Sequence, residues 1–503
     1  MKSPRAILWS KFLRKPIRGS RDRTMTLKAM TILELFCICL LPIGANAGIE
    51  GGAAAVDITP EVWPVYLRGS FFKKEAYTAH DPLHSRAIVL KEGDMRLAMV
   101  IVDSCLISRE NLDQAKRKAS QATGIPVSQM LVAATHTHSA PHDYARYDTE
   151  PEHAYVKQLI EGIAQSIIQA HDALEPVEIG YGSYREPTEV FNRRWFLDPD
   201  AMPANPFGET TDLVKMNPGI TNPALKHSAG PVDPEVFVLS VRTIDGHPLA
   251  LLANYSLHYV GKTPAGQVSA DYFGEFARLI QNRLERHRPD SNFVGILSNG
   301  TSGDINNIPV GSPRPNRETF EQIQLVAGKV ADAAYLAYKS IEHRSDVSLS
   351  MLQEAIILDR RVPSKIQISQ AKSMLERAAK AGSEKDLPRH GVAYAQKVLD
   401  FSEQCELSPT VEILIQTVRI GDLAICTSPF ETFAETGLRL KRQSPFSSTF
   451  TIEQANGAEG YLPTPAQHRL GGYETWLTTS RVEFGASEKL VRKLVGMMRS
   501  LKK

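Results

Sequence analysis

Cysteine is scarce in this sequence, with five residues in 503. Beyond residue 47 only Cys105, Cys405 and Cys426 remain, and they are widely separated. So few thiols exclude a zinc site built from several cysteines and a disulfide-stapled scaffold, and they leave room for one disulfide at most. Cys426 lies in a short apolar run, where a buried free thiol is the expected state.

Long apolar runs, internal repeats and low-complexity tracts are also missing. The apolar run 36–41 is too short to span a bilayer as a helix. Hydrophobic residues make up 42% of the chain and charged residues 23%, which is the composition of a soluble globular protein. These features exclude a disordered, fibrous or multi-span membrane protein.

The first 47 residues differ from the rest, because a basic stretch leads into the run 36–41 and then into Ala45-Asn46-Ala47. This order is typical of a secretory signal peptide, so we expect cleavage after Ala47, export, and a mature chain without a membrane span. A buried N-terminal helix is the alternative. The segment holds 9 of the 58 Lys and Arg residues but 2 of the 56 acidic ones, so residues 48–503 carry a net charge of −5 and give no indication of nucleic-acid binding.

Short apolar runs rich in Val, Ile and Leu alternate with long amphipathic segments, an order typical of an α/β fold. Strands are expected at 88–90, 97–102, 130–134, 236–241, 249–255, 293–297, 411–418 and 423–427, the last two as a hairpin. Helices are expected at 111–122, 153–171, 272–287, 318–343, 364–381, 392–403, 431–441 and 487–501. No linker divides residues 48–503, so we expect one domain. Its polar loops 198–234, 299–317 and 453–475 are the segments expected to be functional or mobile.

The sharpest local motif is Thr135-His136-Thr137-His138-Ser139, which directly follows an apolar run. Residues two apart in an extended chain face the same way, so His136 and His138 can both point at one site. Two ordinary loop histidines are the alternative. The His-x-His-x-Asp-His pattern of metallo-β-lactamases is excluded, because Ala140 and Pro141 take the places of its Asp and His. The later lysine, histidines and aspartate of an amidohydrolase barrel are not found either.

At this motif the sequence begins to resemble the neutral ceramidase family, and the resemblance covers nearly all of residues 48–503. The similar segments include 52–60, 82–87 and the Thr-His-Thr-His-Ser motif. The resemblance implies the family's fold, a large α/β domain of central mixed β-sheets flanked by helices. It also implies that His136 binds zinc and that His138 lies beside the substrate.

Later segments match the same family in the same order. Phe-Asn-Arg-Arg at 191–194 is similar to a segment whose arginine enters the active site, which implies that role for Arg193. An apolar run ends in His258, where the family has its second histidine ligand. Glu431 takes the place of the zinc-binding glutamate in a turn before a helix. Tyr461 and Tyr473, twelve positions apart as in the family, are implied as a metal ligand and a substrate contact.

The predicted zinc ligands are thus His136, His258, Glu431 and Tyr461, and the predicted catalytic residues are His138, Arg193 and Tyr473. Zinc accepts imidazole nitrogen and carboxylate oxygen, and it lowers the pKa of a bound water to about 7. Such a water can attack an amide carbonyl without a catalytic serine. The three catalytic candidates are suited to bind the developing oxyanion or to protonate the leaving amine. Asp271 is expected either to orient a ligand histidine or to cap a turn.

We therefore expect a zinc-dependent amidohydrolase that cleaves ceramide or another small or lipid-like N-acyl substrate. A metal-dependent esterase or phosphoesterase and an exported, non-catalytic binding protein are the alternatives. Asn306 stands where the family has a serine, and the sequence ends at Lys503, so we expect it to lack the ceramidases' C-terminal β-sandwich domain. Both departures leave the metal chemistry intact but change lipid specificity, so long-chain ceramide is not the expected best substrate.

Overall fold

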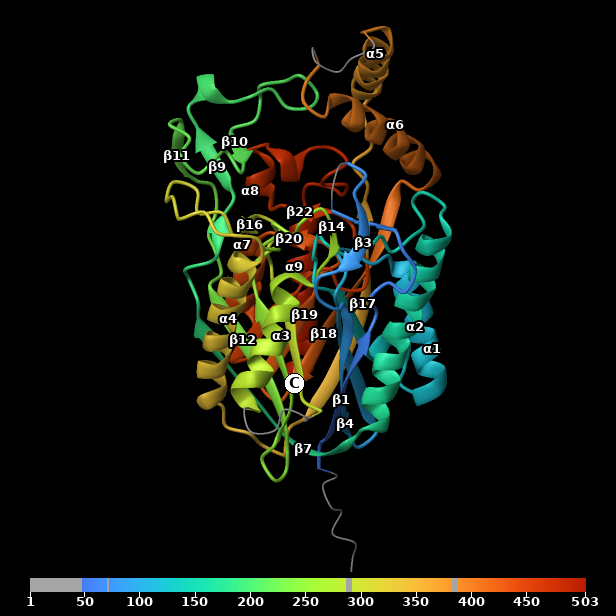
Figure 1. Ribbon diagram of the computed structural model, residues 1–503, viewed down its shortest axis with the longest axis vertical. Coiled ribbons are helices and arrows are strands. Elements are labelled where there is room, and N and C mark those ends of the chain that lie inside the picture. The colour runs from blue at the N-terminus through green and yellow to red at the C-terminus, as the bar shows by residue number, and fades with distance from the viewer. Residues whose placement is uncertain (1–47, 70–71, 286–291, 382–386) are drawn as a thin grey trace, which may run out of the picture. The chain divides into compact units, whose positions relative to one another are not determined.

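The computed structural model describes residues 48–69, 72–285, 292–381 and 387–503. Within these residues two mixed β-sheets pack face to face, and helices cover the outer side of each sheet (Figure 1). This arrangement confirms the predicted α/β class with central mixed sheets flanked by helices. The predicted signal peptide, residues 1–47, lies outside the described residues.

The first sheet has eight strands in the order β15-β13-β12-β7-β1-β4-β5-β6. Their bounds are β1 (Glu50–Asp57), β4 (His84–Glu92), β5 (Met95–Val102), β6 (Met130–Ala134), β7 (Glu175–Arg185), β12 (Glu235–Thr243), β13 (Pro248–Tyr255) and β15 (Val294–Asn299). β1 and β7 pair over two residue pairs at their starts, and the two halves of the sheet diverge from this joint. In each half the last two strands, β5–β6 and β13–β15, run parallel and away from the joint. β15 also contacts β5 and β6, so the two ends of the sheet lie side by side.

The second sheet has four strands, β17 (Leu349–Asp359), β18 (Thr410–Ile420), β19 (Leu423–Thr427) and β21 (Ser448–Ile452), in that order. Apolar side chains from both sheets form the core between them, and the rings of Phe237 and Phe450 lie 4.9 Å apart across it. β18 and β19 form the predicted hairpin, in which Gly421 has a φ of 60°. Glycine adopts this conformation without a steric penalty.

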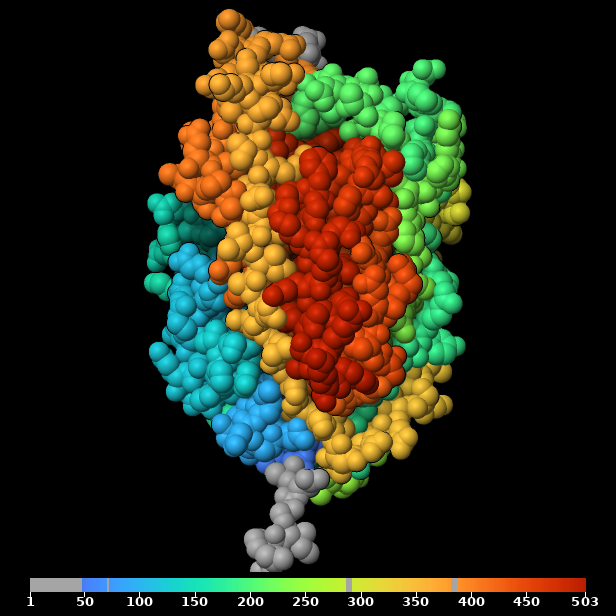
Figure 2. All heavy atoms as spheres, turned by 180° about the vertical axis from the view of Figure 1, so that it is seen from behind, coloured from blue at the N-terminus to red at the C-terminus, as the bar shows by residue number. Residues whose placement is uncertain are grey.

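Four pairs of helices complete the fold. α1 (Arg109–Thr123) and α2 (Glu150–Asp172) cover one half of the first sheet, and α3 (Asp271–Leu284) and α4 (Glu321–Lys339) cover the other. α7 (Ala434–Gln443) and α9 (Ala486–Lys502) cover the outer face of the second sheet, where Figure 2 shows α9 in red. α5 (Lys365–Ala381) and α6 (Gly391–Leu407) form a helical hairpin between β17 and β18.

The remaining elements are short and gather around the loops. They are β2 (Val65–Tyr66), β3 (Glu75–Ala79), β8 (Phe191–Asn192), β9 (Arg194–Leu197), β10 (Val214–Met216), β11 (Leu225–Ser228), β14 (Gly266–Val268), β16 (Ile305–Asn306), β20 (Glu431–Thr432), β22 (Tyr461–Leu462) and α8 (Pro465–His468). Among the described helices, none combines the length and the apolar character needed to cross a bilayer. All three described cysteines are buried and unpaired, which confirms the expected state of Cys426.

Every predicted strand and helix overlaps an observed one, but four strands of the two large sheets, β1, β7, β17 and β21, were not predicted, nor were the short strands outside them. β1 was not predicted because it is rich in Gly and Ala, residues with little preference for strands. Gly52 is small for a packing reason, since a Cβ there would lie 2.1 Å from the Ala170 carbonyl oxygen of α2. A second prediction was wrong at its start: Glu431 lies on β20, and the helix begins three residues later at Ala434.

Candidate metal centre and active site

The two predicted histidine ligands follow the carboxyl ends of β6 and β13, which end at Ala134 and Tyr255. Because β15, the neighbour of β13, contacts β5 and β6, the ends of β6 and β13 lie close together and His136 meets His258 there. His136 has a φ of 69°, an uncommon conformation for a residue other than glycine, and its N–H donates to the Ser104 carbonyl. Strained residues of this kind gather at functional sites.

Three predicted ligands converge on one point. The Nε2 atoms of His136 and His258 are 3.1 Å apart. The Glu431 Oε2 atom lies 3.4 Å from the former and 3.5 Å from the latter. In a tetrahedral zinc site, ligand atoms about 2.0–2.1 Å from the ion are about 3.3 Å from one another. The three distances therefore fit a small cation bound by all three atoms.

The hydrogen bonds behind the histidines leave these facing atoms bare. His136 Nδ1–H donates to the Cys105 carbonyl at 2.7 Å, and His258 Nδ1–H donates to the Ser302 carbonyl at 3.1 Å. A carbonyl only accepts, so in the neutral rings both Nε2 atoms present lone pairs. Glu431 Oε2 is buried and has no hydrogen-bond partner in the described structure. When both rings are neutral, these three atoms are all acceptors and repel one another, and either a bound cation or a proton on His136 relieves that repulsion.

The protonation equilibria of these histidines reflect the same crowding. Burial disfavours the charged form of His136, but the Glu431 carboxylate outweighs this and raises its pKa well above the ordinary value. Burial and the neighbouring His136 charge lower the pKa of His258 well below the ordinary value. His136 therefore takes up a proton readily beside Glu431, and that charge makes protonation of His258 unfavourable.

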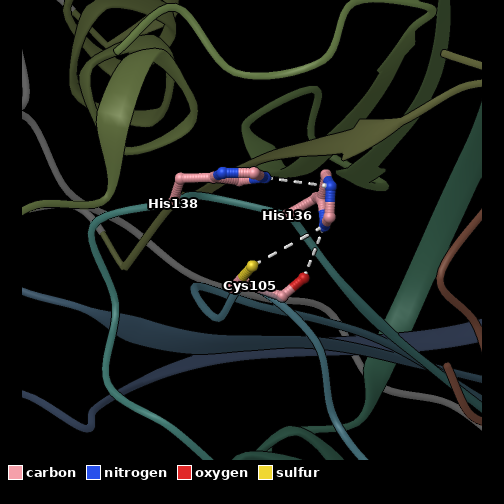
Figure 3. A group of neighbouring side chains, drawn as sticks. All are labelled: Cys105, His136 and His138. Atoms are coloured by element: carbon pink, nitrogen blue, oxygen red, sulfur yellow. Dashed lines mark hydrogen bonds between the residues drawn. The ribbon is translucent and has the colours of Figure 1, made fainter. Parts of the chain in front are cut away.

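His138 and Cys105 approach His136 from opposite sides of its ring (Figure 3). The His138 Nε2 atom lies 3.2 Å from His136 Nε2, whereas the Cys105 sulfur lies 3.9 Å from His136 Nδ1. Cys105 is therefore on the far side of the ring from the point where the three ligands meet, and its carbonyl orients His136. Sequence analysis did not indicate this contact.

Glu431 and Tyr461 are paired residues of β20 and β22, a parallel pair of two-residue strands. Residues paired in this way have side chains on the same face of the strands. Burial raises the pKa of Tyr461 well above the ordinary value, Arg193 opposes this effect, and a side-chain hydrogen bond with Glu431 adds to it. The structure thus brings the fourth predicted ligand beside the third. Zinc binding by these four residues stays a prediction.

Arg193 is buried against the same tyrosine, with its guanidinium carbon 5.4 Å from the centre of the Tyr461 ring. Its Nε donates to Glu474 Oε1 at 2.8 Å, and Arg194 donates to the other oxygen of Glu474 at 2.6 Å. The Arg193 Nη2 atom is buried without a hydrogen-bond partner in the described structure. The Nη2 group of Arg193 is therefore available to a ligand, while its Nε–H is bound to Glu474.

A pocket of about 200 Å³ opens beside the three-ligand centre. It is lined by Gly69, His138, Arg193, Met216, Asn217, His258, Tyr259, Val260, Asn306, Asn307, Ile308, Tyr461 and Tyr473. All three predicted catalytic residues therefore border one space. The Tyr461 and Tyr473 rings are 5.5 Å apart, and burial raises the pKa of Tyr473 well above the ordinary value, so its hydroxyl keeps its proton.

His138 is held at the pocket wall in one orientation. Its Nδ1–H donates to the Gly69 carbonyl at 3.2 Å, and its ring stacks on Tyr259 at 3.9 Å. Burial and the charge of His136 lower its pKa well below the ordinary value. The neutral ring therefore presents the lone pair of Nε2 toward the metal centre.

Two acidic residues of the site were missed from the sequence. Glu453 follows β21 directly and accepts the Ser302 hydroxyl at 2.6 Å, and burial raises its pKa to about 8. Glu474 adjoins Tyr473. In the sequence, Glu453 is marked only by its place after an apolar run and Glu474 only by its place beside Tyr473. Acidic residues in such places are too common in proteins to indicate a site. For Asp271 the structure favours the turn-capping alternative, because its carboxylate accepts the N–H groups of Val260 and Gly261 at 3.0 and 2.8 Å.

Asn306 lines the pocket on the short strand β16, which pairs with β8, the strand directly before Arg193. Its amide nitrogen donates to the Asn217 side-chain oxygen at 2.6 Å, and its own oxygen accepts the N–H of Ile308 at 3.1 Å. Asn306, which stands where the ceramidases have a serine, is thus part of a polar pair at the pocket.

The structure resembles a solved structure of the neutral ceramidase from Pseudomonas aeruginosa, with a TM-score of 0.66 and 18% identity over 90% of this chain and 74% of that chain. In sequence, the neutral ceramidase of P. aeruginosa is 24% identical over 92% of this chain and 72% of its own length. Neutral ceramidase B of Dictyostelium discoideum is 27% identical over 52% of this chain and 36% of its own length.

The family model for the N-terminal part of neutral/alkaline non-lysosomal ceramidases matches residues 50–317, more than half of the chain. That segment contains the two histidines of the metal centre, His138 and Arg193. The chain therefore belongs to the neutral/alkaline non-lysosomal ceramidase family.

Proposed function

We propose that this protein is a zinc-dependent hydrolase that cleaves the amide bond of ceramide or of another N-acylated amphiphile. The observation that carries the proposal is the convergence of two bare imidazole nitrogens and one unpartnered carboxylate oxygen at mutual distances of 3.1–3.5 Å. His136, His258, Glu431 and Tyr461 would hold the ion. Zinc in such a site acts as a Lewis acid and lowers the pKa of a coordinated water to about 7.

The surrounding residues have separate tasks in this proposal. Arg193 Nη2 donates a hydrogen bond to the substrate carbonyl oxygen, and this bond strengthens as negative charge develops there. The bare Nε2 of His138 would accept the proton that the attacking water loses and return it to the nitrogen of the leaving amine. The Tyr473 hydroxyl keeps its proton and orients the substrate. Because His138, Arg193 and Tyr473 are already held in place at a buried site, few water molecules have to reorient when charge develops on the substrate.

A two-metal phosphoesterase, an alternative from the sequence, has less support. Such enzymes bind a second ion about 3.5–4 Å from the first with additional carboxylates. In the described residues, the two groups able to hold a metal share His136, and neither contains an aspartate. We also propose that the protein is exported after cleavage at Ala47, on the sequence pattern described above. N-terminal sequencing of exported protein tests this, and a mature chain that starts elsewhere contradicts it.

The test of the proposed function is hydrolysis of a panel of N-acyl amides, esters and phosphomonoesters by the purified protein. We expect amide cleavage that is lost after dialysis against a strong chelator and restored by zinc, with one zinc per chain in the active form. Amide cleavage that survives complete removal of the metal contradicts zinc dependence. Hydrolysis confined to esters or phosphomonoesters contradicts the proposed reaction.

A further inference from the structure

Glu453 is a fully buried carboxylate at the end of β21. Its hydrogen-bond partners are all uncharged donors: the Ser302 hydroxyl at 2.6 Å, the Ser302 N–H at 3.2 Å and the Thr432 N–H at 2.7 Å. Burying a carboxylate against neutral partners costs free energy, because the charged form loses its hydration. A group retained under that cost is a candidate for a role beyond packing.

Ser302 connects Glu453 to the metal centre. Its carbonyl accepts His258 Nδ1–H at 3.1 Å, and its hydroxyl oxygen is 3.3 Å from the same nitrogen. The hydroxyl proton points to Glu453, so the lone pairs of this oxygen are left for His258. A chain of donors therefore runs from His258 through Ser302 to Glu453. Metal-binding histidines commonly donate their second N–H to a carboxylate or carbonyl, and here one serine stands in between.

The same carboxylate also holds the strand that carries Glu431. Glu453 Oε2 accepts the N–H of Thr432, the residue after Glu431, on β20. The Thr432 carbonyl in turn accepts the N–H of Gly303, the residue after Ser302. Glu453 thus ties the turn behind His258 to the strand behind Glu431, and these two ligands come from segments more than 170 positions apart in the sequence.

We propose that Glu453 is a positioning residue that sets the zinc affinity by holding His258 and Glu431 at a fixed separation through Ser302 and Thr432. The proposal rests on the proposed function, since it takes these residues as zinc ligands. In Glu453→Gln, one carboxylate oxygen becomes an NH₂ group that faces a donor, so at least one of the three hydrogen bonds is lost. Loss of such an outer partner lowers metal affinity about 10–100-fold.

The experiment measures the zinc dissociation constant of the metal-free wild-type protein and its variants by competition with a chromogenic chelator. Glu152→Gln is the matched control. Glu152 is 3% exposed and also accepts two backbone N–H groups and a hydroxyl, from Tyr147 and Thr149, at the start of α2. Each variant replaces a buried carboxylate that accepts uncharged donors, so Glu152→Gln controls for the loss of such a group away from the metal centre. Only Glu453→Gln is expected to weaken zinc binding.

Ser302→Ala separates the proposed connection from a general effect of the charge. The alanine variant keeps the carbonyl bond to His258 but removes the hydroxyl that reaches Glu453. We expect the double variant with Ser302→Ala and Glu453→Gln to bind zinc about as weakly as Glu453→Gln alone. Both substitutions break the same connection between Ser302 and Glu453, so their effects on zinc affinity should not add. Zinc affinity of Glu453→Gln within threefold of the wild type, an equal loss in Glu152→Gln, or fully additive losses each overturn the inference. A wild-type protein that binds no zinc overturns the proposed function as well.

Discussion

The two buried ion pairs that Glu474 forms with Arg193 and Arg194 allow the size of a stability loss to be predicted. Glu474 has no exposed surface, and its two oxygens accept from the two guanidinium groups at 2.8 and 2.6 Å. In Glu474→Gln the amide keeps the shape but can accept from one arginine only. Arg194 retains bonds to Gln467 and to the Gly471 carbonyl, so Arg193 is the group that loses its main counter-charge.

We expect Glu474→Gln to lower the free energy of unfolding by about 3–5 kcal/mol, the usual cost of leaving a buried charge without its partner. Glu178→Gln is the matched control. Glu178 binds Arg242 at 2.6 Å, but the two side chains are 26% and 31% exposed, so its loss is expected to cost about 1 kcal/mol or less. Urea unfolding followed by fluorescence measures both values. We also expect a lower kcat for the Glu474 variant, since Arg193 no longer has one fixed orientation.

The pH dependence has a definite sign. Burial tends to raise the pKa of Glu474, but Arg194 and Arg193 outweigh it, so the pKa is lowered from the ordinary 4.5. A lowered folded-state pKa stabilises the fold fully above the unfolded value of 4.5, and this stabilisation is lost as the pH falls through the folded value. The difference between wild type and Glu474→Gln should therefore shrink below about pH 4.5. A cost no larger than that of Glu178→Gln, or a difference that grows in acid, refutes the reasoning.

Three further predictions test separate parts of the molecule. His258→Ala removes one of four predicted ligands. A four-ligand zinc site has a binding free energy of roughly 10–16 kcal/mol, so the loss of about a quarter of it should lower zinc affinity about 100-fold or more, and turnover should fall with it. An unchanged metal content after dialysis contradicts this. Burial lowers the pKa of Lys116 to about 8 from 10.5, so the free energy of unfolding of the wild type should rise by up to about 3 kcal/mol relative to Lys116→Met between pH 8 and 10.5. Urea unfolding at pH 7.5 and 9.5 measures this, and a difference between the two proteins that does not change with pH argues against it. Asn306→Ser removes the hydrogen bond to Asn217 and should raise kcat/KM for long-chain ceramide relative to shorter N-acyl amides, with the zinc content unchanged. If the wild type already prefers long-chain ceramide more than tenfold, about 1.4 kcal/mol, the asparagine does not set specificity.

The parts of the site that could be predicted are those in which local sequence and topology agree. His136 and His258 each follow an apolar run, and the carboxyl ends of parallel strands are common places for polar site residues. The residues behind them could not be predicted, because their roles depend on distant partners. Ser302 receives its role from Glu453, which lies 151 positions later in the chain. A serine in a loop and an acidic residue after a strand are each too common to indicate such a contact.

Strand prediction failed where packing requirements opposed strand propensity. β1 contains Gly51 and Gly52, and these glycines allow α2 and neighbouring valines to approach the sheet closely. β17 has a burial pattern that alternates only in part, because one face meets the core between the sheets and the other meets α9. Alternation is a reliable signal only when one face of a strand is exposed to solvent.

The pairing of β20 with β22 explains why Glu431 and Tyr461 reach the centre together although they are 30 positions apart. Each strand has only two residues, too few for any sequence pattern to indicate a strand. Their parallel pairing places Glu431 directly opposite Tyr461, and a shift of the register by one residue would turn one side chain to the other face. Pro429's carbonyl accepts the Glu459 N–H at 2.7 Å, and the Glu431 N–H donates to the Gly460 carbonyl at 2.9 Å. These backbone bonds fix the register that sets Glu431 beside Tyr461.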